Sequence, residues 1–137
     1  MKSQLSKILT IVFVILFFTL SKSYSIEEIT ELKKICKKYK LVLVEDAAEA
    51  LGSFYNSKHA GTFGKIGVLS FNGNKTITTG GGGAVLTDDK KIANEIYFLS
   101  RVAKNSNKTF PGYEKVGFNY RMPALNASLG IAQLSNS

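Results

Sequence analysis

Three short apolar runs constrain the fold of this chain more than any other feature of its sequence. They occupy residues 41–46 (LVLVED), 66–71 (IGVLSF) and 83–88 (GAVLTD), and polar residues or glycines bound each of them. Such runs are typical of strands buried in a sheet. Residues 26–39 precede the first run and repeat apolar side chains at helical spacing. A helix followed closely by a buried strand is half of an α/β unit, so the sequence predicts an α/β fold.

The same kind of pattern predicts further helices. Residues 92–102 repeat apolar side chains at helical spacing, with the aspartate at position 88 or 89 as the helix cap. Residues 47–51 predict a short helix, and residues 124–134 predict a final one. Between the last two helices, residues 104–123 predict a long polar and aromatic loop, and loops of that length are usually functional or disordered.

Composition and charge exclude several classes of function. The chain has 137 residues, 45% hydrophobic and 20% charged, which is ordinary for one globular domain. Its net charge of +8 is spread out, and most lysines of residues 26–40 share a helix with glutamates, so we expect a solvated face and no nucleic-acid surface. Cys36 and His59 are each the sole residue of their type, so we expect neither a disulfide framework nor a metal site.

Residues 1–25 differ from the rest of the chain. Lys2 and Lys7 precede a mostly apolar run at residues 8–20, and small polar residues follow it. This is the layout of a secretory signal peptide, and the run is shorter than the ~20 residues of a membrane-spanning helix. We expect either an export or anchoring signal or a leader that does not belong to the domain at residues 26–137.

The stretch LSFNGNKTITTGGGG, residues 69–83, places Lys75 between a predicted strand and four glycines. It contains neither a P-loop nor a G-x-G-x-x-G fingerprint, so it does not support nucleoside triphosphate or Rossmann dinucleotide chemistry. The glycines allow a tight turn behind Lys75 and a return to the sheet where a Cβ atom would collide. A surface hairpin with a solvated lysine is the alternative.

A lysine held in place can form a Schiff base with a carbonyl, and pyridoxal phosphate is such a carbonyl. That cofactor acts as an electron sink when a nearby aspartate keeps its ring nitrogen protonated. The sequence offers Asp46 at the end of one predicted strand and Lys75 in the loop after the next. Taken singly, Asp46 is better explained as an N-cap of the helix predicted after it.

Three stretches resemble the DegT/DnrJ/StrS family of pyridoxal phosphate-dependent sugar aminotransferases: VEDAAEALGSFY, GTFGKIGVLSFNGNKTITTGGGGAVLTDD and VGFNYRMPALNASLGIAQL. The resemblance covers about residues 26 to 134. It implies part of the large domain of the aspartate aminotransferase fold (fold type I), with an incomplete mixed sheet and flanking helices. In this family, segments before and after the matching region complete the enzyme, so we expect a fragment that is inactive alone.

The resemblance assigns roles to individual residues. Lys75 matches the lysine that binds the cofactor and moves the proton during catalysis. Asp46 matches the aspartate that pairs with the ring nitrogen, and Glu49 falls near the phenolic oxygen of the cofactor. Ser70 matches a hydroxyl that contacts the cofactor phosphate.

The predicted loop before the last helix adds three more residues. Asn119 resembles the residue that a neighbouring subunit contributes to the phosphate site. Tyr120 and Arg121 lie beside it in the sequence and are expected near the substrate.

The resemblance also implies an activity. Related dehydratases carry a histidine in place of the lysine, so Lys75 favours transamination. We expect a homodimeric cytoplasmic transaminase that acts on a nucleotide-linked keto-sugar with an amino acid donor, typically glutamate, in amino-sugar and polysaccharide biosynthesis. The alternative is a secreted or membrane-tethered α/β protein without catalytic activity, and a membrane location depends on a genuine leader.

Overall fold

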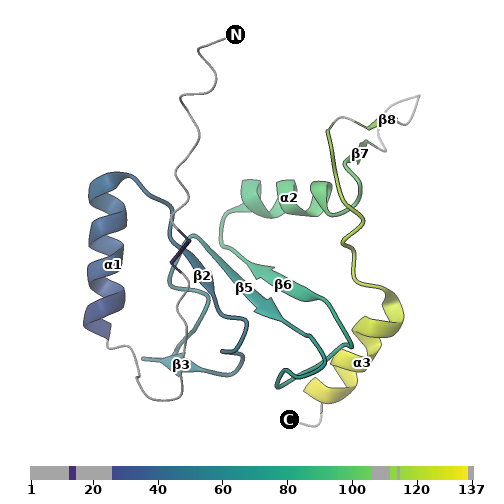
Figure 1. The fold of residues 1–137 in the computed structure, drawn as a ribbon, viewed down its shortest axis with the longest axis horizontal. Helices are drawn as coiled ribbons and strands as arrows, with labels where there is room; N and C mark the ends of the chain where they lie inside the picture. The colour runs from purple at the N-terminus through teal and green to yellow at the C-terminus, as the bar shows by residue number, and fades with distance from the viewer. Residues whose placement is uncertain (1–12, 15–25, 106–111, 114, 136–137) are drawn as a thin grey trace. The chain divides into compact units, whose positions relative to one another are not determined.

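The computed structural model describes residues 13–14, 26–105, 112–113 and 115–135, and the chain divides into two compact units, residues 1–69 and 70–137 (Figure 1). The predicted leader, apart from Phe13 and Val14, lies outside the described residues. Among the residues that are described, no helix has the length and apolar character needed to cross a membrane.

The first unit contains parallel strands in the order β1 (Phe13–Val14), β2 (Val44–Asp46) and β5 (Ile66–Ser70). In the pairing of β2 with β5, Val44 lies opposite Ile66 and Asp46 lies opposite Val68. The predicted strands are confirmed, although β2 begins three residues later than the apolar run and β5 ends one residue before it does. The last residue of β5 is the first residue of the second unit.

Helix α1 (Ile26–Tyr39) confirms the helix predicted for these residues. It ends because Lys40 adopts a left-handed conformation (φ 54°), which directs the chain back over the last turn. The Leu41 N–H then donates to the Cys36 carbonyl at 2.8 Å, and the Lys40 N–H donates to the Lys37 carbonyl at 3.3 Å. This pair of bonds is a Schellman motif, with lysine at the position that glycine usually occupies.

The predicted helix at residues 47–51 is wrong. The structure has successive turns there, in which the Ala50 N–H donates to the Ala47 carbonyl and the Ser53 N–H to the Ala50 carbonyl, each at 3.0 Å. Gly52 follows in a left-handed conformation (φ 80°). The segment between Asp46 and Gly52 is therefore too short to offset the cost of nucleating a helix.

A hairpin that the sequence analysis did not predict follows these turns. Strand β3 (Phe54–Tyr55) pairs antiparallel with β4 (Lys58–His59). The two connecting residues, Asn56 and Ser57, have φ values of 45° and 61°. Positive φ at both positions is the requirement of a type I′ turn, whose twist matches that of the flanking strands.

A buried carboxylate, Glu45, fixes the chain that leads into β5. Its Oε2 accepts a hydrogen bond from the Gly61 N–H at 2.9 Å, and its Oε1 accepts one from the Gly64 N–H. Gly67, opposite Glu45 in β5, packs so closely on Gly61 that an added Cβ would collide with backbone atoms of Gly61. The glycines thus allow the loop to lie directly on the strand.

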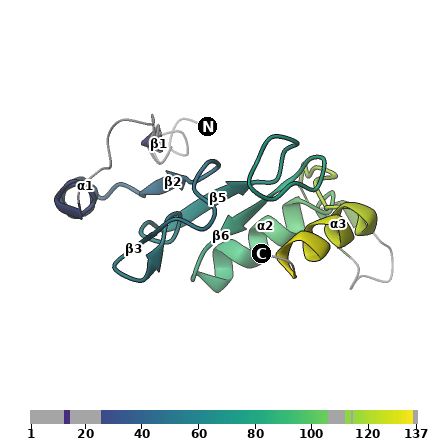
Figure 2. The same ribbon diagram turned by 90° about the horizontal axis from the view of Figure 1, so that it is seen from below.

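The second unit contains β6 (Gly83–Leu86), α2 (Lys90–Leu99) and α3 (Ala124–Leu134) (Figure 2). Asp89 is the N-cap of α2, because its Oδ1 accepts from the Lys91 and Ile92 N–H groups at 2.9 and 3.3 Å. The cap and the last helix are as predicted. Helix α2 ends at Leu99, however, and does not continue to residue 102 as the apolar spacing indicated.

The predicted long loop contains regular structure. Strand β7 (Lys104–Asn105) pairs antiparallel with β8 (Gly112–Tyr113), and an isolated antiparallel bridge joins Arg101 to Asn119. Residues 106–111, between the two strands, lie outside the described part. Because the segments on either side of residues 106–111 pair with each other, part of the predicted loop at residues 104–123 is regular structure.

Candidate functional site

Lys75 lies in a loop whose two ends are hydrogen-bonded to each other. The Phe71 N–H donates to the Gly82 carbonyl at 2.9 Å, and the Thr79 N–H donates to the Phe71 carbonyl at 3.0 Å. Within this loop the Lys75 N–H donates to the Asn72 carbonyl at 3.1 Å, and the residue is half-buried. The backbone at Lys75 is therefore part of a closed turn.

Helix α3 fastens the second half of this loop. The Gln133 amide makes two hydrogen bonds with the backbone of Thr78: Nε2 donates to the carbonyl at 2.6 Å, and Oε1 accepts from the N–H at 3.0 Å. Asn126 Nδ2 donates to the Thr79 carbonyl at 2.6 Å. Both views place α3 alongside the end of this loop (Figures 1 and 2).

The contact between α3 and the loop is also closely packed. Gly130 is buried against Thr79, a residue that is 4% exposed, and a Cβ at Gly130 would lie 2.9 Å from Thr79 Cγ2. Asn126, Gly130 and Gln133 are spaced four and three residues apart, so they lie on one face of the helix. This face was not identified from the sequence, although the spacing of two amides about a glycine is a signal that could have pointed to it.

The glycines behind Lys75 act as expected at two positions. Gly80 (φ 76°) and Gly82 (φ 107°) adopt left-handed conformations that favour glycine. A Cβ at Gly82 would lie 2.9 Å from Met122 Cε, whereas one at Gly81 would meet nothing within 4 Å. The tight return of the chain is thus due to Gly80 and Gly82.

Ser70, the last residue of β5, lies at the start of the segment that leads to Lys75. It is half-buried, and its Oγ accepts a hydrogen bond from the Asn72 N–H at 3.3 Å. Within the described residues its hydroxyl donates no hydrogen bond, so it can donate to an acceptor such as a phosphate oxygen. That Ser70 contacts a phosphate stays a prediction.

Asp46 and Glu49 belong to the first unit. Asp46 is the last residue of β2 and is exposed, and its Oδ1 accepts from the Ala48 N–H at 3.1 Å. Because side chains alternate along a strand, Asp46 points away from the face on which its neighbour Glu45 is buried. Glu49 is exposed in the turns that follow. The pairing of Asp46 and Glu49 with a cofactor stays a prediction.

Asn119 is positioned by a short antiparallel pairing after α2. The Phe118 N–H donates to the Leu99 carbonyl at 2.8 Å, and the Tyr120 N–H donates to the Ser100 carbonyl at 3.0 Å. The ring of Tyr120 stacks on that of Phe118, with centroids 5.1 Å apart and planes 12° from parallel. These contacts fix the backbone on both sides of Asn119.

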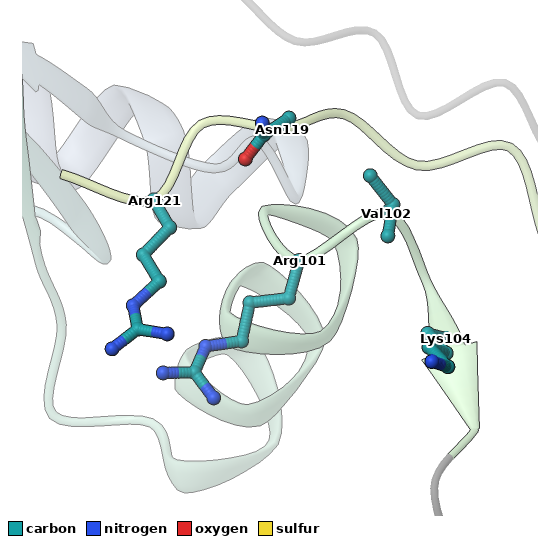
Figure 3. A pocket seen from close by; sticks show the side chains of 5 residues that line it. All are labelled: Arg101, Val102, Lys104, Asn119 and Arg121. Carbon is teal, nitrogen blue, oxygen red and sulfur yellow. The ribbon is translucent and has the colours of Figure 1, made fainter. Parts of the chain in front are cut away.

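A pocket of about 410 Å³ lies beside this pairing (Figure 3). It brings together two of the predicted site residues, Asn119 and Arg121. It also contains residues that were not singled out from the sequence: Arg101, Val102 and Lys104. No spacing rule links positions 101 and 121. The two segments are joined by the bridge between Arg101 and Asn119 and by the backbone hydrogen bonds on either side of it.

Curated proteins similar to this chain include an aminotransferase and enzymes named for amino sugars. EpsN of Bacillus subtilis, whose name describes a pyridoxal phosphate-dependent aminotransferase, is 41% identical over 104 residues, which is 76% of this chain and 26% of EpsN. GDP-perosamine synthase of Escherichia coli O157:H7 is 41% identical over 110 residues, 80% of this chain and 30% of that enzyme. The chain thus spans less than a third of the length of these relatives.

Solved structures give the same result. PseC of Helicobacter pylori, an aminotransferase involved in the biosynthesis of pseudoaminic acid, superposes with a TM-score of 0.74 at 33% identity, over 80% of this chain and 30% of PseC. The fold is therefore part of the α/β fold of these aminotransferases, as the sequence predicted. Residues 25–137 match the sequence pattern of the DegT/DnrJ/EryC1/StrS aminotransferase family. The chain belongs to this family.

Proposed function

We propose that this chain forms part of a pyridoxal phosphate-dependent transaminase that acts on a nucleotide-linked keto-sugar. The observation that carries the proposal is the lysine loop of a family aminotransferase: Lys75 sits in a closed turn between Ser70 and Gly82, and helix α3 fastens that turn. Because the chain matches only about 30% of its relatives' length, the activity is proposed for the complete enzyme.

Taken one at a time, the residues present have the chemistry that the cofactor needs. Within the described part of the chain, Asp46 Oδ2 is without a hydrogen-bond partner, so an exposed carboxylate oxygen is available to a cationic ring nitrogen. The Ser70 hydroxyl can donate to a phosphate oxygen. A Cβ at Gly73, between Ser70 and Lys75, would have no atom within 4 Å apart from those of its chain neighbours, so the space beside this backbone position is open.

Each residue then has a defined task. When bound, the cofactor supplies an electron sink for the amino group transfer. Lys75 Nζ would bind the cofactor aldehyde and afterwards move a proton to and from the reacting carbon of the substrate. Asp46 would hold the positive charge of the ring nitrogen, and Glu49 would lie near the phenolic oxygen. Ser70 would orient the phosphate.

The names of the relatives support the substrate class, since GDP-perosamine synthases and UDP-linked altrosamine transaminases are among them. We infer a nucleoside diphosphate sugar as the acceptor and an amino acid, typically glutamate, as the donor. We further infer a homodimer in which Asn119 reaches the phosphate site of the partner and Tyr120 lies near the substrate. The cytoplasm, which contains both substrates, is the proposed location.

The test is site-specific attachment to Lys75. The purified chain is titrated with pyridoxal phosphate, reduced with borohydride and mapped by mass spectrometry. We expect the reduced adduct mainly on Lys75, a loss of that adduct in Lys75→Arg, and no change in Lys90→Arg, which alters an exposed lysine of α2. An adduct spread evenly over the exposed lysines, with no preference for Lys75, would overturn the proposal.

A further inference from the structure

The pocket beside Asn119 gathers positive charge without compensating carboxylates. Arg101, Lys104 and Arg121 line it together with Val102 and Asn119, and no acidic side chain is among the lining residues. Among the residues that the structure describes, none of these three cations forms an ion pair. Nearby, Lys115 is paired with Glu95 at 2.5 Å, so carboxylates in this unit do find partners elsewhere. Like charges in one pocket repel each other, and a bound anion would offset this repulsion by attracting each of them.

The Arg101 guanidinium is held in place by the fold. Figure 3 shows the side chains of Arg101 and Arg121 extending in the same direction from separate segments. The Arg101 guanidinium stacks over the Tyr97 ring, 4.1 Å from its centroid. The bridge from Arg101 to Asn119 aligns the two segments. Little conformational freedom of Arg101 therefore remains to be lost when a ligand binds.

The backbone at the pocket is strained. Val102 and Ala103 both adopt left-handed conformations, with φ values of 57° and 51°, although neither is glycine. Ala103 is fully buried, and its N–H donates to the Phe98 carbonyl at 3.1 Å. Strained residues of this kind concentrate at functional sites, where the surrounding structure maintains them.

We propose that Arg101, Lys104 and Arg121 bind the diphosphate group of the nucleotide-linked substrate. Planar guanidinium groups match phosphate oxygens in pairs, and the Lys104 ammonium adds a point charge. A volume of about 410 Å³ lies within the range of small-molecule pockets and exceeds what a single phosphate needs. This inference rests on the proposed function, because it names the part of that substrate which this pocket recognises.

The experiment is a calorimetric titration of the full 137-residue chain with inorganic pyrophosphate, inorganic phosphate and pyridoxal phosphate at low salt. We expect pyrophosphate to bind at least about tenfold more tightly than phosphate, because it can reach both guanidinium groups. The affinity should fall as sodium chloride is added. The double variant R101Q/R121Q should bind pyrophosphate at least about tenfold more weakly.

A matched control is K90Q/K91Q, which removes two charges from exposed residues of α2 outside the pocket. It should change pyrophosphate affinity less than about twofold, since its effect is only through screened charge. Circular dichroism of each variant is recorded with the titrations. A conservative variant, Arg121→Lys, keeps the charge and should retain part of the affinity while losing the paired geometry.

Four outcomes overturn the inference: no binding of pyrophosphate to the wild-type chain, equal affinity for phosphate, equal weakening in K90Q/K91Q, or pyridoxal phosphate binding that R101Q/R121Q abolishes. The last would assign the pocket to the cofactor phosphate. The result is separable from the lysine test. Pyrophosphate binding without an adduct on Lys75 would reject the proposed function alone, and an adduct without pyrophosphate binding would reject this pocket alone.

Discussion

Replacing Gln133 by methionine tests whether helix α3 holds the lysine loop. Methionine keeps the length and helix propensity of glutamine but removes both hydrogen bonds to Thr78. A net hydrogen bond contributes about 1 kcal/mol, and both Thr78 and Gln133 are half-buried, so water can only partly replace the lost partner. We expect the free energy of unfolding to fall by about 2 kcal/mol.

The loss should be concentrated at the loop. The Thr78 N–H donates to Gln133 Oε1 in the wild type, so its hydrogen exchange should accelerate by about 30-fold, the factor that corresponds to 2 kcal/mol. The Ala47 N–H, which donates to the Val68 carbonyl in the first unit, serves as the internal reference. Exchange at Ala47 should change much less than exchange at Thr78.

Two further variants complete this test. Ile131→Met places the same residue on α3 at an exposed position and should change neither stability nor Thr78 exchange appreciably. Asn126→Ala, which removes the bond to the Thr79 carbonyl, should couple with Gln133→Met by more than about 0.5 kcal/mol, because both side chains hold neighbouring residues of one loop. If Gln133→Met leaves Thr78 exchange within about twofold of the wild type, α3 does not hold the loop.

Two other predictions concern close packing and a buried carboxylate. Gly117→Ala should destabilise the second unit by about 1–3 kcal/mol and abolish pyrophosphate binding, because its Cβ would lie 2.5 Å from the Val102 carbonyl carbon. Gly112→Ala, where a Cβ meets nothing within 4 Å, should do neither in the same urea and titration assays. Glu45→Gln should lower the free energy of unfolding in urea by about 2 kcal/mol, because an amide can accept from only one of the two glycine N–H groups. Glu31→Gln, at an exposed surface pair, should lower it by less than about 1 kcal/mol, and equal effects of the two variants would contradict a structural role for Glu45.

The sequence correctly predicted those helices whose bounds depend on residues near to them in the chain. The helix at residues 26–39, the cap at Asp89 and the helix at residues 124–134 follow from spacing and capping, which depend on near neighbours. The helix at residues 47–51 and the extension of α2 to residue 102 were wrong, because apolar spacing does not register a chain reversal. Val102 continues the apolar pattern, but its backbone adopts a left-handed conformation and the residue lines the pocket.

The pocket beside Asn119 could be predicted only in part, because it is formed by the pairing of two segments that are far apart in the sequence. The motif residues Asn119 and Arg121 were named from their resemblance to the family, yet their neighbours in the pocket come from a segment about twenty residues earlier. The bridge from Arg101 to Asn119 and the close approach of Gly117 to Ala103 create that neighbourhood. Neither contact has a periodic signature, so Arg101 and Lys104 could be recognised only once the backbone was placed.

Helix α3 shows why an apolar pattern can indicate a helix without indicating its contacts. Its large apolar side chains, Leu125, Leu129, Ile131 and Leu134, are 83, 48, 66 and 60% exposed, whereas its buried residue is Gly130. The face that meets the lysine loop is made of two amides and a glycine, because the loop presents backbone N–H and C=O groups that need partners. An apolar face could not satisfy those groups. The loop that carries Lys75 therefore requires a polar helix face as its partner. Through this contact Gln133, far along the sequence, helps to position the proposed catalytic lysine.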